Sequence, residues 1–240
     1  MLDIFYPHRC PICDDVLPAG SDSTACIKCE RIVQKVAGPY CLKCGKPIGD
    51  ERKEFCTDCT KREYFYIQGK AAFVYDKYMK KSIAAFKYRG RREYGNYYAE
   101  QIVKKHKKWI DGIEAQCLIP VPIHHERYRK RGYNQAKIIA DEIGKRVELP
   151  VIDKFIERNK NTEALKDLSE AKRRECLKDA FFISETSKLL YRDLRCVILV
   201  DDIYTTGNTI NECTAVLKRA GVKKVYFLCA CIGKDDQGGE

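Results

Sequence analysis

Four cysteine pairs in the first quarter of the chain constrain its fold more than any other feature. Each pair has the spacing Cys-x-x-Cys, and gaps of 12, 11 and 11 residues separate consecutive pairs. A Cys-x-x-Cys turn lets two thiolates reach one Zn²⁺, and two such turns complete a tetrahedral site. The four turns therefore predict two closed structural zinc sites, with these eight ligands: Cys10, Cys13, Cys26, Cys29, Cys41, Cys44, Cys56 and Cys59.

The spacing leaves open which pairs share an ion. Sequential pairing is the simplest arrangement, but interleaved pairing has the same ligand count. The near-regular spacing is an internal repeat, one zinc ribbon followed by another. The polar segment 1–66 is too small to fold by apolar burial alone, so bound zinc would stabilise it directly. A redox dithiol is the alternative, although redox motifs come singly. We expect the other six cysteines to pack in the core: Cys117, Cys176, Cys196, Cys213, Cys229 and Cys231.

Charge divides the chain at the same place. Residues 1–66 hold ten basic and ten acidic side chains, so the net charge of +11 belongs to the rest. Between Lys77 and Arg131 there are fifteen basic and five acidic residues. Tyrosines interleave with them: Tyr78, Tyr88, Tyr94, Tyr97, Tyr98 and Tyr128. Basic and aromatic side chains together suit phosphates and stacked bases, which indicates single-stranded nucleic acid. A solvated lysine-rich surface is the alternative interpretation.

Strand and helix patterns alternate after the cysteine pairs. Apolar or β-branched runs predict strands at 70–75, 116–122, 180–184, 196–200 and 224–232. Helical spacing of apolar residues predicts helices at 79–88, 97–109, 132–146 and 209–221. This alternation indicates an α/β domain, with a parallel sheet covered by helices on both faces.

The stretch VILVDDIYTTGNTI places polar chemistry at the end of the strand predicted at 196–200. Ligands of such sheets bind beyond the carboxyl ends of the strands. The loop that opens the next helix offers free backbone N–H groups to a phosphate, and the two aspartates can accept hydrogen bonds from vicinal sugar hydroxyls. We therefore predict a ribose 5-phosphate site; the alternative is an ordinary strand–turn–helix. A P-loop is excluded because G-x-x-x-x-G-K-[ST] is absent.

The same stretch resembles the phosphoribosyl-pyrophosphate (PRPP) motif of type I phosphoribosyltransferases. LIPVPIHHERYRKRGYNQA resembles the signature of the ComF family of competence-associated proteins, and RNKNTEALKDLSEAKRRECLKDAF resembles a further stretch of that family. The resemblance covers nearly the whole chain. It implies an α/β fold in which a double zinc ribbon, residues 1–66, precedes a parallel-sheet type I phosphoribosyltransferase-like domain, residues 67–240.

The resemblance also implies roles for individual residues. Two aspartates would contact the ribose hydroxyls and the following loop the 5-phosphate: Asp201, Asp202, Thr205, Thr206, Gly207, Asn208 and Thr209. Pyrophosphate, with Mg²⁺, would lie against a second set: Lys87, Arg127, Arg131, Gly132, Asn134 and Gln135. A lid or nucleic-acid contact would involve Thr162, Leu168, Ser169 and Arg173. The chain departs from the family pattern at His125, Leu165 and Cys176, of which the last two bear on acceptor specificity.

Three functions fit this sequence. The first is a competence or DNA-processing factor that binds PRPP and single-stranded DNA, with the ATP-dependent helicase that ComF-type proteins accompany as a partner. The second is an active phosphoribosyltransferase; His124 lies near the expected loop, but no residue is assigned a catalytic role. The third is a zinc-ribbon adaptor whose sugar-phosphate site is vestigial.

We expect the protein to be cytoplasmic and not to span a membrane. The chain has no run of 18 or more apolar residues, and its first residues lack a basic leader followed by an apolar segment. Fourteen cysteines in such a chain indicate metal ligands and core positions rather than disulfides.

Overall fold

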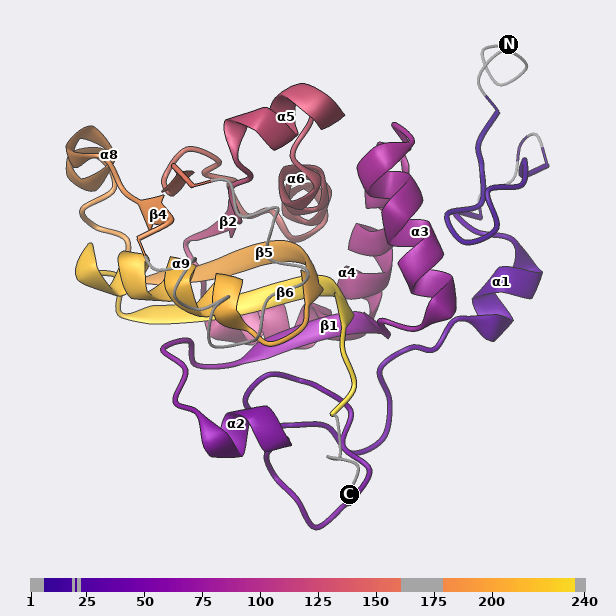
Figure 1. Cartoon of the computed structure of the whole chain (residues 1–240), viewed down its shortest axis with the longest axis horizontal. Helices are drawn as coiled ribbons and strands as arrows, with labels where there is room; N and C mark the ends of the chain where they lie inside the picture. The colour runs from indigo at the N-terminus through magenta and orange to yellow at the C-terminus, as the bar shows by residue number, and fades with distance from the viewer. Residues whose placement is uncertain (1–6, 19, 21–22, 161–178, 236–240) are drawn as a thin grey trace.

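A four-stranded, entirely parallel sheet lies at the centre of the computed structural model, which describes residues 7–18, 20, 23–160 and 179–235 (Figure 1). The strand order is β1-β6-β5-β2. The strands are β1 (Gly69–Val74), β2 (Cys117–Pro120), β5 (Cys196–Tyr204) and β6 (Lys224–Ile232). The predicted parallel α/β sheet is confirmed.

Helices cover both faces of this sheet, as Figure 1 shows. Alternate residues of a strand point to opposite faces, and those of β5 enter two separate apolar clusters. Ile198 and Val200 pack in one cluster with residues of α3, α4 and α6. Val197 and Leu199 pack in the other with residues of α9. The helices are α3 (Lys77–Tyr88), α4 (Tyr94–Ile113), α6 (Gln135–Val147) and α9 (Asn208–Arg219).

The helix predicted at 132–146 corresponds to α6 (Gln135–Val147), and a short helix that the sequence pattern did not predict precedes it. This short helix, α5 (His125–Arg131), ends at Gly132, which takes the left-handed conformation with φ 75°. The next helix, α6, begins only after Asn134, whose side chain accepts a hydrogen bond from the backbone N–H of Ala136. The sequence pattern missed α5 because a helix this short and polar has no apolar stripe; its seven residues include none that is buried.

Strand lengths also differ from the prediction. The strand predicted at 196–200 continues to Tyr204, because its partner β6 pairs with it as far as Ile232. The strand predicted at 180–184 is reduced to β4 (Phe181–Phe182), which pairs antiparallel with β3 (Glu157–Arg158) outside the main sheet. A further short helix, α8 (Glu185–Leu190), follows β4.

The two zinc ribbons repeat the same local structure, which confirms the internal repeat. In each, a backbone N–H donates to the carbonyl of the first cysteine, from Asp14 to Cys10 at 2.9 Å and from Gly45 to Cys41 at 2.9 Å. Asp14 and Gly45 both have positive φ, 68° and 82°. Each ribbon ends in a short helix, α1 (Ile27–Ile32) or α2 (Thr57–Lys61).

The ribbons lie on opposite faces of the sheet. Cysteines of the first ribbon share the apolar cluster of α3 and α4, and those of the second share the cluster of α9. The segment between them, Gln34–Val36, runs antiparallel along β1, with Val36 N donating to Ala72 O at 2.9 Å and Val74 N to Gln34 O at 2.8 Å. Figure 1 shows α1 beside α3 and α2 beneath β1. The division at residue 66 stays a prediction.

Candidate ligand site and metal centres

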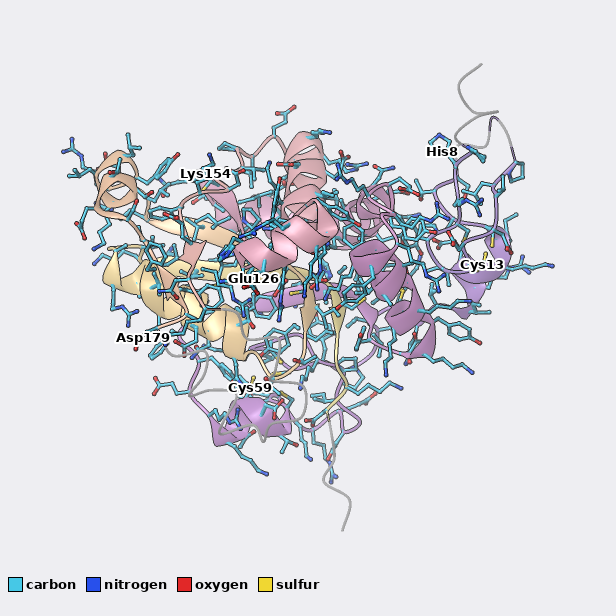
Figure 2. All side chains as sticks on the ribbon, turned by 45° about the horizontal axis from the view of Figure 1, so that its top comes forward. His8, Cys13, Cys59, Glu126, Lys154 and Asp179 are labelled. Carbon is cyan, nitrogen blue, oxygen red and sulfur yellow. The ribbon has the colours of Figure 1, made fainter. Side chains whose placement is uncertain are left out.

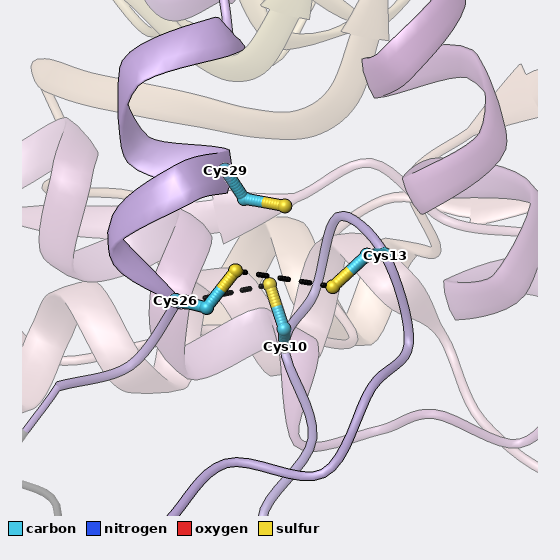
Figure 3. Close-up of side chains that lie close together, drawn as sticks. All are labelled: Cys10, Cys13, Cys26 and Cys29. Atoms are coloured by element: carbon cyan, nitrogen blue, oxygen red, sulfur yellow. Dashed lines mark hydrogen bonds between the residues drawn. The ribbon is translucent and has the colours of Figure 1, made fainter.

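Each ribbon gathers four cysteine side chains into one cluster. The clusters are Cys10, Cys13, Cys26, Cys29 and Cys41, Cys44, Cys56, Cys59, so sequential pairing is the arrangement found. In each, the ligand atoms lie within 4.8 Å of one another, and Figure 3 shows the four sulfurs of the first converging on one point.

The geometry of both clusters fits Zn²⁺. Tetrahedral Zn–S bonds of about 2.3 Å separate two sulfurs by about 3.8 Å. The Cys13 and Cys26 sulfurs are 3.9 Å apart and those of Cys44 and Cys56 are 3.6 Å apart, too far for disulfides. Burial raises the pKa of the Cys13 thiol to about 11, an effect that a bound cation would oppose. The donor set therefore supports two structural zinc sites with no open position.

A cavity of about 480 Å³ opens at the carboxyl ends of β5 and β2, the edge that parallel-sheet ligands use. Nine of the thirteen residues predicted for the sugar-phosphate site line it: Lys87, Arg127, Arg131, Asn134, Gln135, Asp201, Asp202, Thr205 and Thr209. The other four, Gly132, Thr206, Gly207 and Asn208, are outside its lining. Gly207 and Gly132 instead shape the backbone beside it.

The loop from Thr205 to Gly207, here called the phosphate loop, leads directly into α9. Gly207 is the N-cap residue, with φ 77°. A Cβ atom on Gly207 would lie 2.3 Å from the hydroxyl oxygen of Tyr204, so both the backbone angle and the space require glycine. The first N–H groups of α9 have no partner within the helix, and its positive dipole end faces the same side. The loop therefore has the features of a phosphate cradle.

Asp201 and Asp202 lie near the carboxyl end of β5, and Lys87 pairs with the second of them. Lys87 Nζ lies 2.5 Å from Asp202 Oδ2, and the Asp202 side chain is 9% exposed. Burial alone would lower the pKa of Lys87, but the Asp202 carboxylate outweighs burial and raises that pKa above its ordinary value. The lysine is thus held as a cation in the cavity.

The pKa of Asp201 is also raised, which for a carboxyl group favours the neutral form. Burial, with the Asp202 charge as the second cause, raises the pKa of Asp201 to about 8, although Lys87 acts against this. Its Oδ1 accepts a hydrogen bond from the Asp202 backbone N–H at 2.8 Å. Near neutral pH the aspartate pair therefore keeps one proton.

Replacing Asp201 by Asn is expected to stabilise the unliganded protein increasingly as pH rises from about 4 to about 8. The folded protein holds this proton below its raised pKa while the unfolded chain has already lost it, so wild-type stability falls as pH rises through that window. The asparagine keeps the hydrogen-bond acceptor and has no proton to lose. The melting temperatures of the wild type and the variant, measured near the lower and the upper end of this pH range, give the effect. A change of 1 kcal/mol in stability shifts the melting temperature of a protein of this size by about 2–4 °C. An equal difference in melting temperature at both pH values would contradict this account.

Polar donors without partners line or flank this cavity. The Nε of Arg127, the Nε2 of Gln135 and the Nδ2 of Asn208 are buried and form no hydrogen bond within the described residues. Buried donors are nearly always satisfied in folded proteins, so these point to a ligand rich in acceptors. All three residues were predicted from the sequence.

Cations predominate on the other side of the cavity. Arg131 donates to Gln135 Oε1 at 3.0 Å and to the Tyr88 hydroxyl at 3.2 Å. A second cavity of about 310 Å³ adjoins the first, and it is lined by Lys87, Tyr88, Gly90, Arg127, Lys130 and Arg131. Because its lining contains four basic side chains and no acid, this second cavity also suits an anion.

The residues of the larger cavity that the sequence interpretation missed include Arg158 and Tyr75. Arg158, from β3, lines it; burial, aided by the charge of Arg127, lowers the pKa of Arg158 to about 10. Tyr75 follows β1 and also lines it. Tyr75 had a signal, since it is the last residue of the strand predicted at 70–75; a lone arginine in a polar stretch had none.

The aromatic and basic surface is smaller than the sequence suggested. Tyr94, Tyr97 and Tyr98 are core residues, whereas Tyr88 and Tyr128 are 61% and 53% exposed. Some of the basic residues form ion pairs, including Arg91 with Asp14 and Lys107 with Asp111. The exposed tyrosines lie on α3 and α5, next to the second cavity.

His124 orders a turn. It is buried, and its Nδ1 accepts the backbone N–H of Glu126 at 3.4 Å as the N-cap of α5. The positions expected to form a lid or a nucleic-acid contact lie outside the described residues: Thr162, Leu168, Ser169 and Arg173, with the departures Leu165 and Cys176. Within the described ranges, no helix combines the length and apolar character needed to cross a membrane.

Comparison with known proteins agrees with this arrangement. The family model described as "Double zinc ribbon domain" matches residues 1–60, and that described as "Phosphoribosyl transferase domain" matches residues 129–239. The fold and site thus define a phosphoribosyltransferase-type domain joined to a double zinc ribbon. This is the combination of domains of the ComF family, and the chain is similar to competence proteins of that family over most of its length.

Three relatives illustrate the similarity. Competence protein F of Haemophilus influenzae is 28% identical over 224 residues, which cover 92% of this chain and 95% of that protein. Competence protein ComFC of Bacillus subtilis is 26% identical, with 83% and 80% covered. DNA utilization protein YhgH of Escherichia coli O157:H7 is 29% identical over 127 residues, which cover 52% of this chain and 54% of that protein.

Proposed function

We propose that this protein binds PRPP with Mg²⁺, binds single-stranded DNA, and acts in natural transformation, in the uptake or processing of DNA. One observation carries the proposal. A single cavity brings together an aspartate pair, the open N-terminus of α9 and the arginines Arg127 and Arg131. For a ligand with a diol and two separate phosphate groups, the cavity offers a binding partner for each of these groups.

The assignment of each part follows from chemistry. Carboxylates accept hydrogen bonds from vicinal hydroxyls, free helix N–H groups bind a phosphate, and guanidinium groups match pyrophosphate. Mg²⁺ is usually bound through one or two carboxylates together with substrate phosphates, and Asp201 and Asp202 fit that donor set. The bound cation would offset part of the pyrophosphate charge.

DNA binding is supported by the surface beside this site. The second cavity, lined by Lys130 and Arg131 among others, is basic, and the exposed rings of Tyr88 and Tyr128 are close by in the fold. Basic grooves with aromatic rings bind single strands without sequence preference. Two relatives are named competence proteins and a third a DNA utilization protein. A competence helicase is the proposed protein partner, and the free thiols of the described cysteines suit a cytoplasmic location.

Calorimetric titration of PRPP with Mg²⁺ into the zinc-loaded protein tests the first part. We expect micromolar affinity, reduced at least about a hundredfold in the Asp201→Ala/Asp202→Ala double variant, because the diol loses both acceptors. No binding by the wild type would reject the proposal and favour an adaptor with a vestigial site. Pyrophosphate release on adding a nitrogenous acceptor would identify the protein as an active transferase.

Affinity for a single-stranded oligonucleotide, measured by fluorescence anisotropy at several salt concentrations, tests the second part. Affinity is expected to fall steeply as salt rises, because phosphate contacts release counterions. Tyr128→Ala should weaken binding about five- to a hundredfold through the lost stacking. Tyr40→Ala, a surface tyrosine of the second ribbon, is the control. Salt-independent affinity would contradict the proposal.

A further inference from the structure

Three consecutive residues that follow the second zinc ribbon contact the phosphate loop and the start of α9. We call Tyr64–Tyr66 the tyrosine link. The Tyr64 hydroxyl donates to the carbonyl of Thr206 at 2.8 Å. The backbone N–H of Phe65 donates to Asn211 Oδ1 at 2.8 Å. Tyr64 and Phe65 therefore contact a segment that lies far from them in sequence.

The third contact joins Tyr66 to Tyr204, the residue that directly precedes the phosphate loop. The hydroxyls of Tyr66 and Tyr204 are 2.6 Å apart, and both residues are buried. The Tyr204 hydroxyl occupies the space that a side chain at Gly207 would need. The Tyr204 ring also stacks on Phe227 at 4.8 Å. Tyr66 thus holds in place the Tyr204 side chain, which packs against Gly207.

The other end of the tyrosine link is joined to the second zinc cluster. Tyr64 and Tyr66 share a buried cluster with Cys41, Cys44 and Cys56. The second ribbon is held to the sheet by Gly69 N donating to Lys43 O at 2.9 Å. A hydrogen bond from Thr57 N to Asp235 Oδ1, also 2.9 Å, joins α2 to the segment after β6.

The first ribbon makes its contacts elsewhere. The Tyr94 hydroxyl donates to Asp14 Oδ1 at 2.5 Å, and the Thr24 hydroxyl donates to Glu100 Oε2 at 2.6 Å. Both partners belong to α4. Figure 2 shows Cys13 and Cys59 in separate parts of the molecule, with Cys59 below the sheet and near the start of α9. The two metal centres, although similar in their ligands, therefore have different neighbours.

We propose that the second zinc ribbon positions the phosphate loop through Tyr64 and Tyr66, so that affinity for the sugar phosphate depends on the second zinc site and not on the first. The identity of the ligand rests on the proposed function, whereas the coupling between ribbon and loop does not. If the link is broken, the loop spends less time in the binding conformation, and the apparent affinity falls by the same fraction.

Two variants that each lose one hydroxyl group test the link. Tyr64→Phe and Tyr66→Phe are each expected to weaken binding of PRPP with Mg²⁺ about tenfold, because each removes one hydrogen bond that holds the loop. Backbone amide exchange over residues 204–211, measured without ligand, should become faster by a similar factor. Tyr98→Phe is the matched control, since it removes a buried hydroxyl bonded to Ser82, between α3 and α4.

A second pair of variants tests the metal. Cys59 and Cys13 are both partly exposed members of their clusters. Cys59→Ser should lower zinc content, speed amide exchange in the phosphate loop and weaken PRPP binding. Cys13→Ser should lower zinc content by the same amount and, under conditions in which the variant stays folded, leave loop exchange unchanged. Should Cys59→Ser fail to fold, the two tyrosine variants still decide the question.

The outcomes separate this inference from the proposed function. If the wild type does not bind PRPP but loop exchange responds to Tyr66→Phe and Cys59→Ser, the coupling is supported and the ligand assignment is rejected. If the wild type binds PRPP and the tyrosine variants match Tyr98→Phe in both exchange and affinity, the coupling is overturned.

Discussion

Removal of both zinc ions is expected to abolish cooperative unfolding of the whole protein and not only of residues 1–66. Structural zinc contributes about 10–16 kcal/mol in small zinc domains, which matches or exceeds the total stability of about 5–15 kcal/mol typical of a native protein. Here the ribbons share both apolar clusters with the sheet. Loss of metal would therefore open the core on both faces.

Thermal unfolding followed by near-ultraviolet circular dichroism, with and without a strong chelator, measures this effect. We expect the sharp transition of the zinc-loaded protein to disappear after chelation and to return when zinc is added back. Metal content must be measured in parallel. A metal-free protein that still unfolded in one sharp transition at the original temperature would show that the ribbons do not support the sheet.

Replacing Lys87 by Met is expected to destabilise the unliganded protein by about 2–3 kcal/mol near pH 8. Removing one partner of a buried ion pair typically costs about 3–5 kcal/mol, and the 20% exposure of the Lys87 side chain reduces that figure. The two aspartates would then lose the cation closest to them. PRPP affinity should fall as well, because the variant site has one positive charge fewer for pyrophosphate.

A double-mutant cycle assigns this loss to the ion pair. Lys87→Met/Asp202→Asn should recover most of the stability that Lys87→Met loses, because it removes the unpaired carboxylate. Chemical unfolding of the four proteins gives the coupling free energy. If the double variant were less stable than Lys87→Met by the full cost of Asp202→Asn, the ion pair would have no role in stability.

The cysteine clusters and the aspartate–glycine stretch could be located from the sequence because each consists of residues close together in it. Ligand spacing within a Cys-x-x-Cys turn is local, and so is the succession of strand, aspartates and glycine turn from Val197 to Gly207. Asp201, Asp202 and Thr205 of this stretch, with Thr209 just after it, line one cavity. The resemblance to the ComF family added the arginines of α5.

What the sequence could not supply depends on contacts between distant segments. The pairing of the cysteines follows from how the two ribbons separate onto the two faces of the sheet. The burial of Tyr94, Tyr97 and Tyr98 follows from the packing of α4, which a count of tyrosines beside lysines does not register. The contacts of Tyr64 and Tyr66 join residues about 140 positions apart, and no spacing rule reaches that far.

The position of β6 has a consequence for how the chain folds during synthesis. This strand lies between β1 and β5 in the sheet, although it comes last in sequence among the strands that the structure describes. Until the ribosome has released it, β1 can pair only with Gln34–Val36. The zinc ribbons can form early, but the apolar surfaces that they share with the sheet stay exposed to solvent until β6 has been synthesised. The nascent protein is therefore most prone to aggregate just before β6 emerges from the ribosome.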